Sequence, residues 1–276
     1  MKLRAAMIHG TVAAALLFGS AGVAGCASVE VSPIDTTLAA SVDDPSGLFT
    51  SILEAHVHDG LVDYAKLTDD PRLDVYVAWL ARTDPSTLAG EKDRLAFWIN
   101  AYNAYTLKLI RDNYPVTSIN DLHSGGRIIG YVTKKTAWDK AFAVVGGETY
   151  TLNHIEHKII RPRFSDPRVH FALVCAAMSC PPLRAQAYEG NQLDEQLDEQ
   201  GRVFFAESAK NYFDLDTKTA HLSKILDWYK GDFGENDRDV LLAISPYLDD
   251  AVRASIESDP AAWDIEHTHY DWSLNE

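Results

Sequence analysis

The segment EKDRLAFWINAYNAYTLKLIRDNYP, residues 91–115, carries the strongest helical pattern in the chain and limits what the other elements can build around it. Its apolar residues recur at helical spacing along one face: Leu95, Trp98, Ile99, Tyr102, Leu109 and Ile110. Asn113 and Pro115 follow, and both residue types commonly end a helix. The pattern predicts a long helix over residues 91–112.

Two asparagines interrupt this otherwise mostly apolar helix. Asn100 and Asn103 lie three residues apart, beside Trp98 and Tyr102. Asparagine is a poor residue inside helices, and a buried amide needs hydrogen-bond partners. The pair is expected either to fix neighbouring loops or to present amides to a substrate carbonyl. Asn100 is therefore a candidate ligand-binding residue, and Asn103 a candidate donor to an oxyanion.

The remaining patterns mix helices and strands. Helical spacing is found over residues 46–60, 70–83, 153–164, 191–209, 225–233 and 237–258. Strand or hairpin patterns cover residues 61–67, 141–152, 169–175, 212–223 and 263–275, with Gly146-Gly147 as a hairpin turn. The strands do not alternate regularly with helices, so the predicted class is α+β.

The N-terminus predicts export. Lys2 and Arg4 precede a short apolar run that is typical of a signal peptide over residues 1–25. The run ends in Val-Ala-Gly-Cys, which resembles the bacterial lipobox, with Cys26 as the lipidated residue. Residues 26–45 are expected to form the lipidated N-terminus and a flexible tether, and residues 46–276 a single domain. Ala27 is compatible with an outer-membrane destination.

Charge narrows the partners. Removing Lys2 and Arg4 takes the formal charge from −15 to −17. Such an acidic protein is not expected to bind nucleic acid or anionic lipid surfaces. The expected partners are the membrane, through a lipid anchor on Cys26, and an unidentified small-molecule or peptide ligand. No cofactor motif is found, so none is expected. The predicted location is the periplasmic side of the cell envelope.

Cys175 and Cys180 are the only cysteines after Cys26, in the segment HFALVCAAMSCPPL. Three interpretations stay open. In an oxidising compartment the two could form a disulfide. Alternatively Cys180, ahead of Pro181 at the possible start of a helix, could be an activated thiol. Both could also simply pack in the core, and Cys175 fits that role best.

Histidines supply candidate bases for such a thiol. His170 is predicted to begin a buried strand over residues 169–175 and would meet Cys180 only if the chain curls back. His154, Glu156 and His157 share one turn of the predicted helix 153–164. There Asn153 and Glu156 have the spacing of a capping box. His154 and His157 could orient a substrate, whereas two histidines alone are a weak metal signal.

The tail offers a further metal pattern in His267, His269 and Asp271. These alternate residues would project from one face of a final strand. A solvated face of that strand is the favoured explanation, so no metal site is assigned.

Four motifs in order resemble the domain of unknown function 547 family: LAFWINAYNAYTL, LNHIEHKIIRPRF, DPRVHFALVCAAMSCPPL and YDWSLN. The resemblance runs from about residue 46 to residue 275. It implies a fold similar to papain-like cysteine peptidases and transglutaminases, with a central helix packed on an antiparallel sheet. In such enzymes the catalytic cysteine starts the central helix. The helix at 91–112 has no cysteine, so the resemblance supports the fold more than the chemistry.

Two functions follow as hypotheses. The first is a thiol-dependent hydrolase or transferase acting on amide or thioester bonds. Cys180 would be its nucleophile, His170 or His157 the base, Glu156 the group orienting His157, and Asn103 the oxyanion donor. The second is a non-catalytic envelope protein that binds a ligand or partner, with Cys175 and Cys180 bridged or buried.

Overall fold

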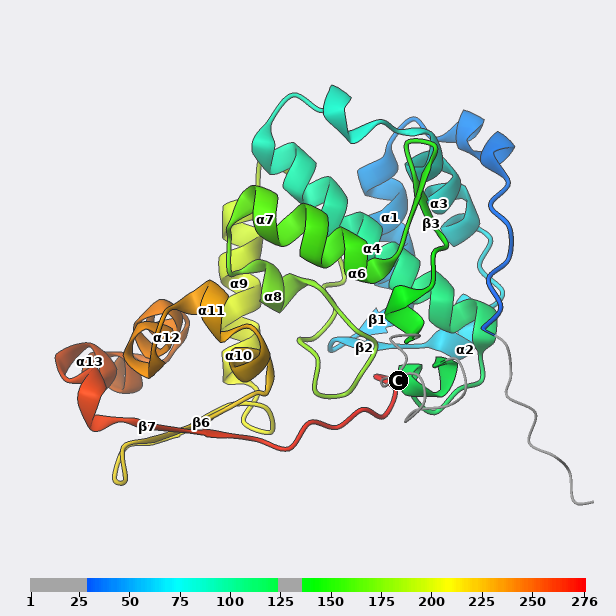
Figure 1. Cartoon of the computed structure of the whole chain (residues 1–276). Helices are drawn as coiled ribbons and strands as arrows, with labels where there is room; N and C mark the ends of the chain where they lie inside the picture. The colour runs from blue at the N-terminus through cyan, green and yellow to red at the C-terminus, as the bar shows by residue number, and fades with distance from the viewer. Residues whose placement is uncertain (1–28, 124–135) are drawn as a thin grey trace, which may run out of the picture.

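The long helix α4 (Glu91–Asn113) lies at the centre of the computed structural model, with α1, α3 and α7 around it (Figure 1). The structure describes residues 29–123 and 136–276, so the predicted signal peptide and Cys26 lie outside the described residues. Almost every side chain from Leu95 to Arg111 is buried. The helix predicted over residues 91–112 is confirmed, and it forms the middle of the hydrophobic core.

Short helices and small sheets complete the fold. The other α-helices are α1 (Pro45–His56), α2 (Tyr64–Leu67), α3 (Arg72–Arg82), α6 (Leu152–His154), α7 (Arg161–Phe164), α8 (Val169–Ala172), α9 (Leu193–Ala206), α10 (Ile225–Trp228), α11 (Lys230–Phe233), α12 (Asp237–Ile244) and α13 (Asp250–Ser258). The 3₁₀ turns are η1 (Thr36–Ser41), η2 (Pro85–Thr87), η3 (Ile119–Leu122), η4 (Ala137–Asp139), η6 (Ser245–Tyr247) and η7 (Pro260–Ala262), and η5 (Ile155–Ile160) is a π-helix. Over the described residues, no helix has the length and apolarity needed to cross a bilayer.

The strands form three separate sheets. Antiparallel pairs join β1 (Val57–His58) to β2 (Leu61–Val62), and β3 (Ala143–Val145) to β4 (Glu148–Tyr150). The third sheet has the order β5 (Tyr212–Asp214), β6 (Thr219–Leu222) and β7 (Asp264–His267), in which β7 is parallel to β6. The α+β class is confirmed, as a mostly helical fold. Within residues 29–123 and 136–276, the strands do not join into one antiparallel sheet against α4.

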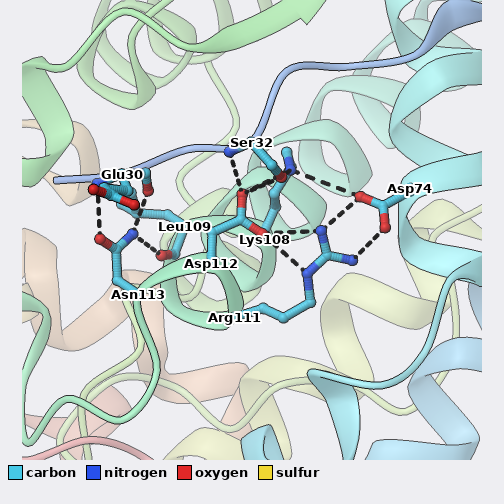
Figure 2. Close-up of polar contacts among 8 residues, drawn as sticks. All are labelled: Glu30, Ser32, Asp74, Lys108, Leu109, Arg111, Asp112 and Asn113. Carbon is cyan, nitrogen blue, oxygen red and sulfur yellow. Dashed lines mark hydrogen bonds and ion pairs between the residues drawn. The ribbon is translucent and has the colours of Figure 1, made fainter.

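The segment before α1 is attached to the domain. The Glu30 N–H donates to the side-chain oxygen of Asn113 at 2.9 Å (Figure 2). The Ser32 hydroxyl lies 2.8 Å from the Asp112 carboxylate, which also pairs at 2.7 Å with the buried ammonium of Lys108 (Figure 2). An ion pair that is both buried and hydrogen-bonded holds its geometry better than an exposed one. Contacts with α4 therefore begin near Glu30, within the range for which a flexible tether was expected.

Three local predictions were wrong. The strand expected over residues 61–67 ends at Val62, and the chain then forms helix α2 (Tyr64–Leu67). Residues 169–175 were expected to be a strand, but α8 (Val169–Ala172) is helical and the chain becomes extended only afterwards. A short apolar run does not distinguish a buried strand from a buried helix. Thr151, not Asn153, caps the helix that follows: its hydroxyl accepts the His154 N–H at 2.9 Å. The Asn153 amide instead donates to Asp139 at 2.6 Å.

The two asparagines of α4 fix loops. Asn103 donates to the Ala172 carbonyl at 2.9 Å and accepts the Val174 N–H at 3.0 Å. Asn100 makes the same pair of bonds with the backbone of Tyr188, at 2.8 and 2.9 Å. Both amides are buried. Each donates one hydrogen bond to, and accepts one from, a single short backbone segment. Of the two roles expected for them, the structure shows the fixing of loops.

We expect Asn103→Ala to lower the free energy of unfolding by about 2 kcal/mol, because a buried N–H and carbonyl lose their partners. Urea denaturation measures this change. Asn191→Ala, at an exposed asparagine, is the matched control and should change stability by no more than about 0.5 kcal/mol. Equal stability of Asn103→Ala and the control would contradict the role of this amide.

Candidate functional site

A pocket of about 510 Å³ lies where η4, η5, α8, α10 and the segment after β7 meet. We call residues 268–276 the C-terminal segment. Both cysteines, Glu156, His157 and His170 line the pocket, although they come from separate turns and loops. We call it the cystine pocket. The structure therefore brings together most of the residues proposed from sequence as a catalytic group.

Cys175 and Cys180 form a disulfide, with Cα atoms 6.1 Å apart. The intervening chain reverses at Ala176, whose φ of 57° lies in the left-handed region that a non-glycine residue rarely adopts. Of the three interpretations of the pair, this is the one the structure contains. A bridged Cys180 has no thiolate, so its role as nucleophile stays a prediction for a reduced form. No helix begins at Pro181, so the helix N-terminus expected to activate Cys180 is missing.

The C-terminal segment closes the pocket over the disulfide. Leu274 pairs with Ala177 in an isolated β-bridge, and the Met178 N–H donates to the Ser273 carbonyl at 2.8 Å. This pairing places the Tyr270 hydroxyl 3.2 Å from the Cys175 sulfur and 3.3 Å from the Cys180 sulfur. The segment runs from β7 back across the molecule to end near β2 (Figure 1).

Glu156 is a buried carboxylate held by two tyrosines. It lies in the π-helix η5, a rare form that is frequent at functional sites. Burial first, and then the neighbouring Glu156 carboxylate, raise the pKa of Tyr102 and of Tyr229. Both hydroxyls therefore stay protonated beside the Glu156 carboxylate. The helix-capping role expected for Glu156 is wrong, because its side chain points into the core and the pocket.

His170 belongs to a chain of polar contacts on one wall. Its Nε2 lies 2.7 Å from Asp232, and its ring stacks on Tyr229 with centroids 3.9 Å apart. Arg161 donates to the other Asp232 oxygen at 2.7 Å and lies 3.0 Å from His157 Nδ1. Hydrogen bonds from Arg161 outweigh burial and hold the pKa of Asp232 at about 2. Asp232 is thus ionised at neutral pH and orients His170.

The other candidate residues lie elsewhere. Asn100 and Asn103 use their amides on backbone, and neither lines the pocket. His154 is exposed, near the ring of Tyr150, so it does not pair with His157 in the pocket. Glu156 lies 3.8 Å from His157 Nδ1, which is too long for a hydrogen bond. Glu156 is therefore beside His157 without orienting it, and Arg161 does so instead.

The tail histidines do not gather as the strand pattern suggested. Strand β7 ends at His267, and the Asp271 carboxylate accepts the Ser273 N–H at 2.9 Å. In the described part of the chain, no three His, Cys, Asp or Glu side chains are arranged to hold a metal ion.

Aromatic residues form the part of the site that sequence reasoning missed. Trp138, Trp228, Tyr229, Tyr270 and Trp272 all line the pocket. Only the last two belong to a motif that drew attention, YDWSLN, and there as a family resemblance. Scattered aromatic residues are usually core, so nothing in their spacing identified them as a group.

The pKa of His170 offers a direct test of its contact with Asp232. Burial lowers the pKa of His170 below its ordinary value of 6.5, and the hydrogen bond to Asp232 acts in the opposite direction. We expect Asp232→Asn to lower the pKa of His170 further, measured by NMR of the imidazole nitrogens. Folding favours neutral His170, so His170 makes stability fall as the pH drops below about 6.5 towards the folded-state pKa.

A His170 pKa that stays unchanged or rises in Asp232→Asn would contradict the assigned contact.

Comparison with known proteins identifies one domain. Residues 85–205 match the family described as "Protein of unknown function, DUF547". No curated protein and no solved structure matches the chain. The matched range is narrower than the expected 46–275. It includes α4 and both pocket cysteines, but not α10 or the C-terminal segment. The chain therefore carries a domain of the DUF547 family over residues 85–205.

Proposed function

We propose that this protein binds a small organic ligand in the cystine pocket. The observation that carries the proposal is the pocket itself, with its volume of about 510 Å³ and its largely aromatic lining around a few polar groups. Sites for small molecules typically enclose roughly 300–1,000 Å³ and combine apolar walls with a few placed polar side chains. Glu156, His157 and His170 are such polar groups here.

The disulfide supports binding over thiol chemistry. It closes the loop between Cys175 and Cys180, and that loop pairs with the C-terminal segment that carries Tyr270 and Trp272. In this function the cystine is a rigid wall and not a reagent. A stable disulfide also suits an exported protein. We also propose that the protein lies on the periplasmic side of the envelope, anchored through a lipid on Cys26.

Filling the pocket tests the proposal. We expect Leu173→Trp to abolish the stabilisation by any ligand that raises the melting temperature of the wild-type protein, because the added ring occupies the cavity beside the disulfide. A small-molecule library screened by differential scanning fluorimetry supplies the ligands. Leu242→Trp makes the same exchange at an exposed site on α12 and should leave every shift intact.

Ligands that stabilise wild type and Leu173→Trp equally would bind outside the pocket and contradict the proposal. Melting curves without ligand show whether Leu173→Trp folds. If it does not, Trp228→Leu replaces it, because Trp228 lines the same pocket and is 48% exposed.

A thiol-dependent hydrolase or transferase is the second candidate. It is favoured by one observation: the two cysteines share the pocket with Glu156, His157 and His170. The family resemblance to papain-like enzymes agrees with it, although Asn103 uses one amide N–H and its carbonyl oxygen on backbone and does not line the pocket, as an oxyanion donor would have to. In this function the reduced Cys180 would attack an amide or thioester carbonyl, with a histidine taking its proton.

If the protein is such an enzyme, we expect activity only after the Cys175–Cys180 disulfide is reduced. Hydrolysis of a model thioester should appear with a non-thiol reductant and be lost in Cys180→Ala but not in Cys175→Ala. Equal loss in both variants, or equal activity without reductant, would contradict a nucleophilic Cys180.

A further inference from the structure

We propose that the ligand of the cystine pocket is an organic cation whose charge carries apolar groups, such as an alkylated ammonium. This inference rests on the proposed ligand-binding function and adds the chemical class of the ligand. It is carried by the juxtaposition of four aromatic rings, Trp138, Trp228, Tyr270 and Trp272, with the carboxylates of Asp139 and Glu156 around one cavity.

The rings are inclined to one another. Tyr270 lies against Trp228 and Trp272, with centroids 4.7 and 4.6 Å apart and an angle of 52° between planes in each case. Trp138 meets Trp272 at 5.9 Å and 67°. Trp228 and Trp272 are closer to parallel, with centroids 5.8 Å apart and 25° between planes. Several aromatic rings that line one cavity at different inclinations supply the electron-rich surface to which a cation is attracted. Tryptophan is the ring type that attracts cations most strongly.

The carboxylates supply negative charge beside these rings. Burial raises the pKa of Asp139, but hydrogen bonds from Thr136 and Asn153 outweigh burial and lower it, so Asp139 is ionised at neutral pH. Glu156 is only 6% exposed and lines the cavity together with Tyr102 and Tyr229. Two carboxylates that lie beside the aromatic rings favour a positively charged ligand. This Coulomb attraction does not require a hydrogen-bond donor in one fixed position.

Other ligand classes find less to bind. No Lys or Arg side chain is among the described lining residues, and the nearby Arg161 is paired with Asp232 and stacked over Tyr229, so the described lining offers no free Lys or Arg to an anion. A sugar would need free donors and acceptors. Several polar groups of the lining already have partners in the protein, as with Asn153 on Asp139 and His170 on Asp232. A weakly hydrated organic cation needs neither a basic side chain nor free hydrogen-bonding groups.

The test compares choline with 3,3-dimethylbutan-1-ol, its neutral analogue in which carbon replaces the charged nitrogen. The two have nearly the same shape, so a difference in affinity reports the charge. Isothermal titration calorimetry on the oxidised domain should show choline binding at least about tenfold more tightly than the alcohol, as cation–π attraction in a desolvated site implies.

Variants assign the binding to the named groups. Trp228→Leu and Glu156→Gln should each weaken choline binding about fivefold or more while leaving the alcohol nearly unchanged. Trp79→Leu is the matched control, because Trp79 lies on α3 at a different cavity, and it should bind choline as wild type does. Thermal melting checks that each variant is folded. Trp228 is 48% exposed, so its replacement removes little core.

Three results would overturn the inference: equal affinity for choline and the alcohol, no heat from choline at millimolar concentrations, or unchanged choline binding in both Trp228→Leu and Glu156→Gln. The proposed ligand-binding function fails separately, when no library compound distinguishes wild type from Leu173→Trp. If the library compounds that stabilise wild type but not Leu173→Trp are neutral or anionic, the pocket is a binding site but the inference of a cationic ligand is wrong.

Discussion

The buried amide of Asn103 is the contact on which the site depends. It binds Ala172 and Val174 on both sides of Leu173 and so fixes the chain where it leaves α8 and enters the disulfide loop. Because α4 is buried along almost its whole length, the loop is attached to the middle of the hydrophobic core. Asn100, one turn earlier, fixes the backbone at Tyr188 in the same way. Asn103, which was expected to donate to an oxyanion, and Asn100, which was expected to bind a ligand, therefore both support neighbouring backbone.

Beyond Val174, the disulfide and backbone hydrogen bonds position the remaining parts of the pocket. The disulfide holds the loop of residues 175–180 closed, and the loop in turn pairs with the C-terminal segment through Ala177 and Leu274. That pairing delivers Tyr270 to the two sulfurs. Each layer is positioned by the previous one, so the cavity combines residues that are far apart in the sequence. Such a preorganised lining reduces the ordering cost of binding a ligand.

Periodicity predicted the elements whose signal is long or has a clear turn, such as the helix over residues 91–112 and the hairpin around Gly146-Gly147. It failed at residues 169–175, because a short apolar run fits either a buried strand or a buried helix. Spacing alone also gave Glu156 a capping role, whereas the Thr151 hydroxyl is the cap and Glu156 faces two tyrosines. The aromatic side of the pocket was beyond sequence reasoning: Tyr270 meets Cys180 across 90 residues, and no local pattern encodes that contact.

The central claim is that Cys175 and Cys180 form a structural wall of a binding pocket. The most direct test is alkylation of the native protein without reductant, over a range of pH, with the modified residues mapped by mass spectrometry. We predict that neither cysteine is labelled until reduction, and that the unreduced mass lacks the two thiol hydrogens. Rapid labelling of Cys180 well below the ordinary thiol pKa of about 8.5 would contradict the claim and indicate a reactive thiolate instead.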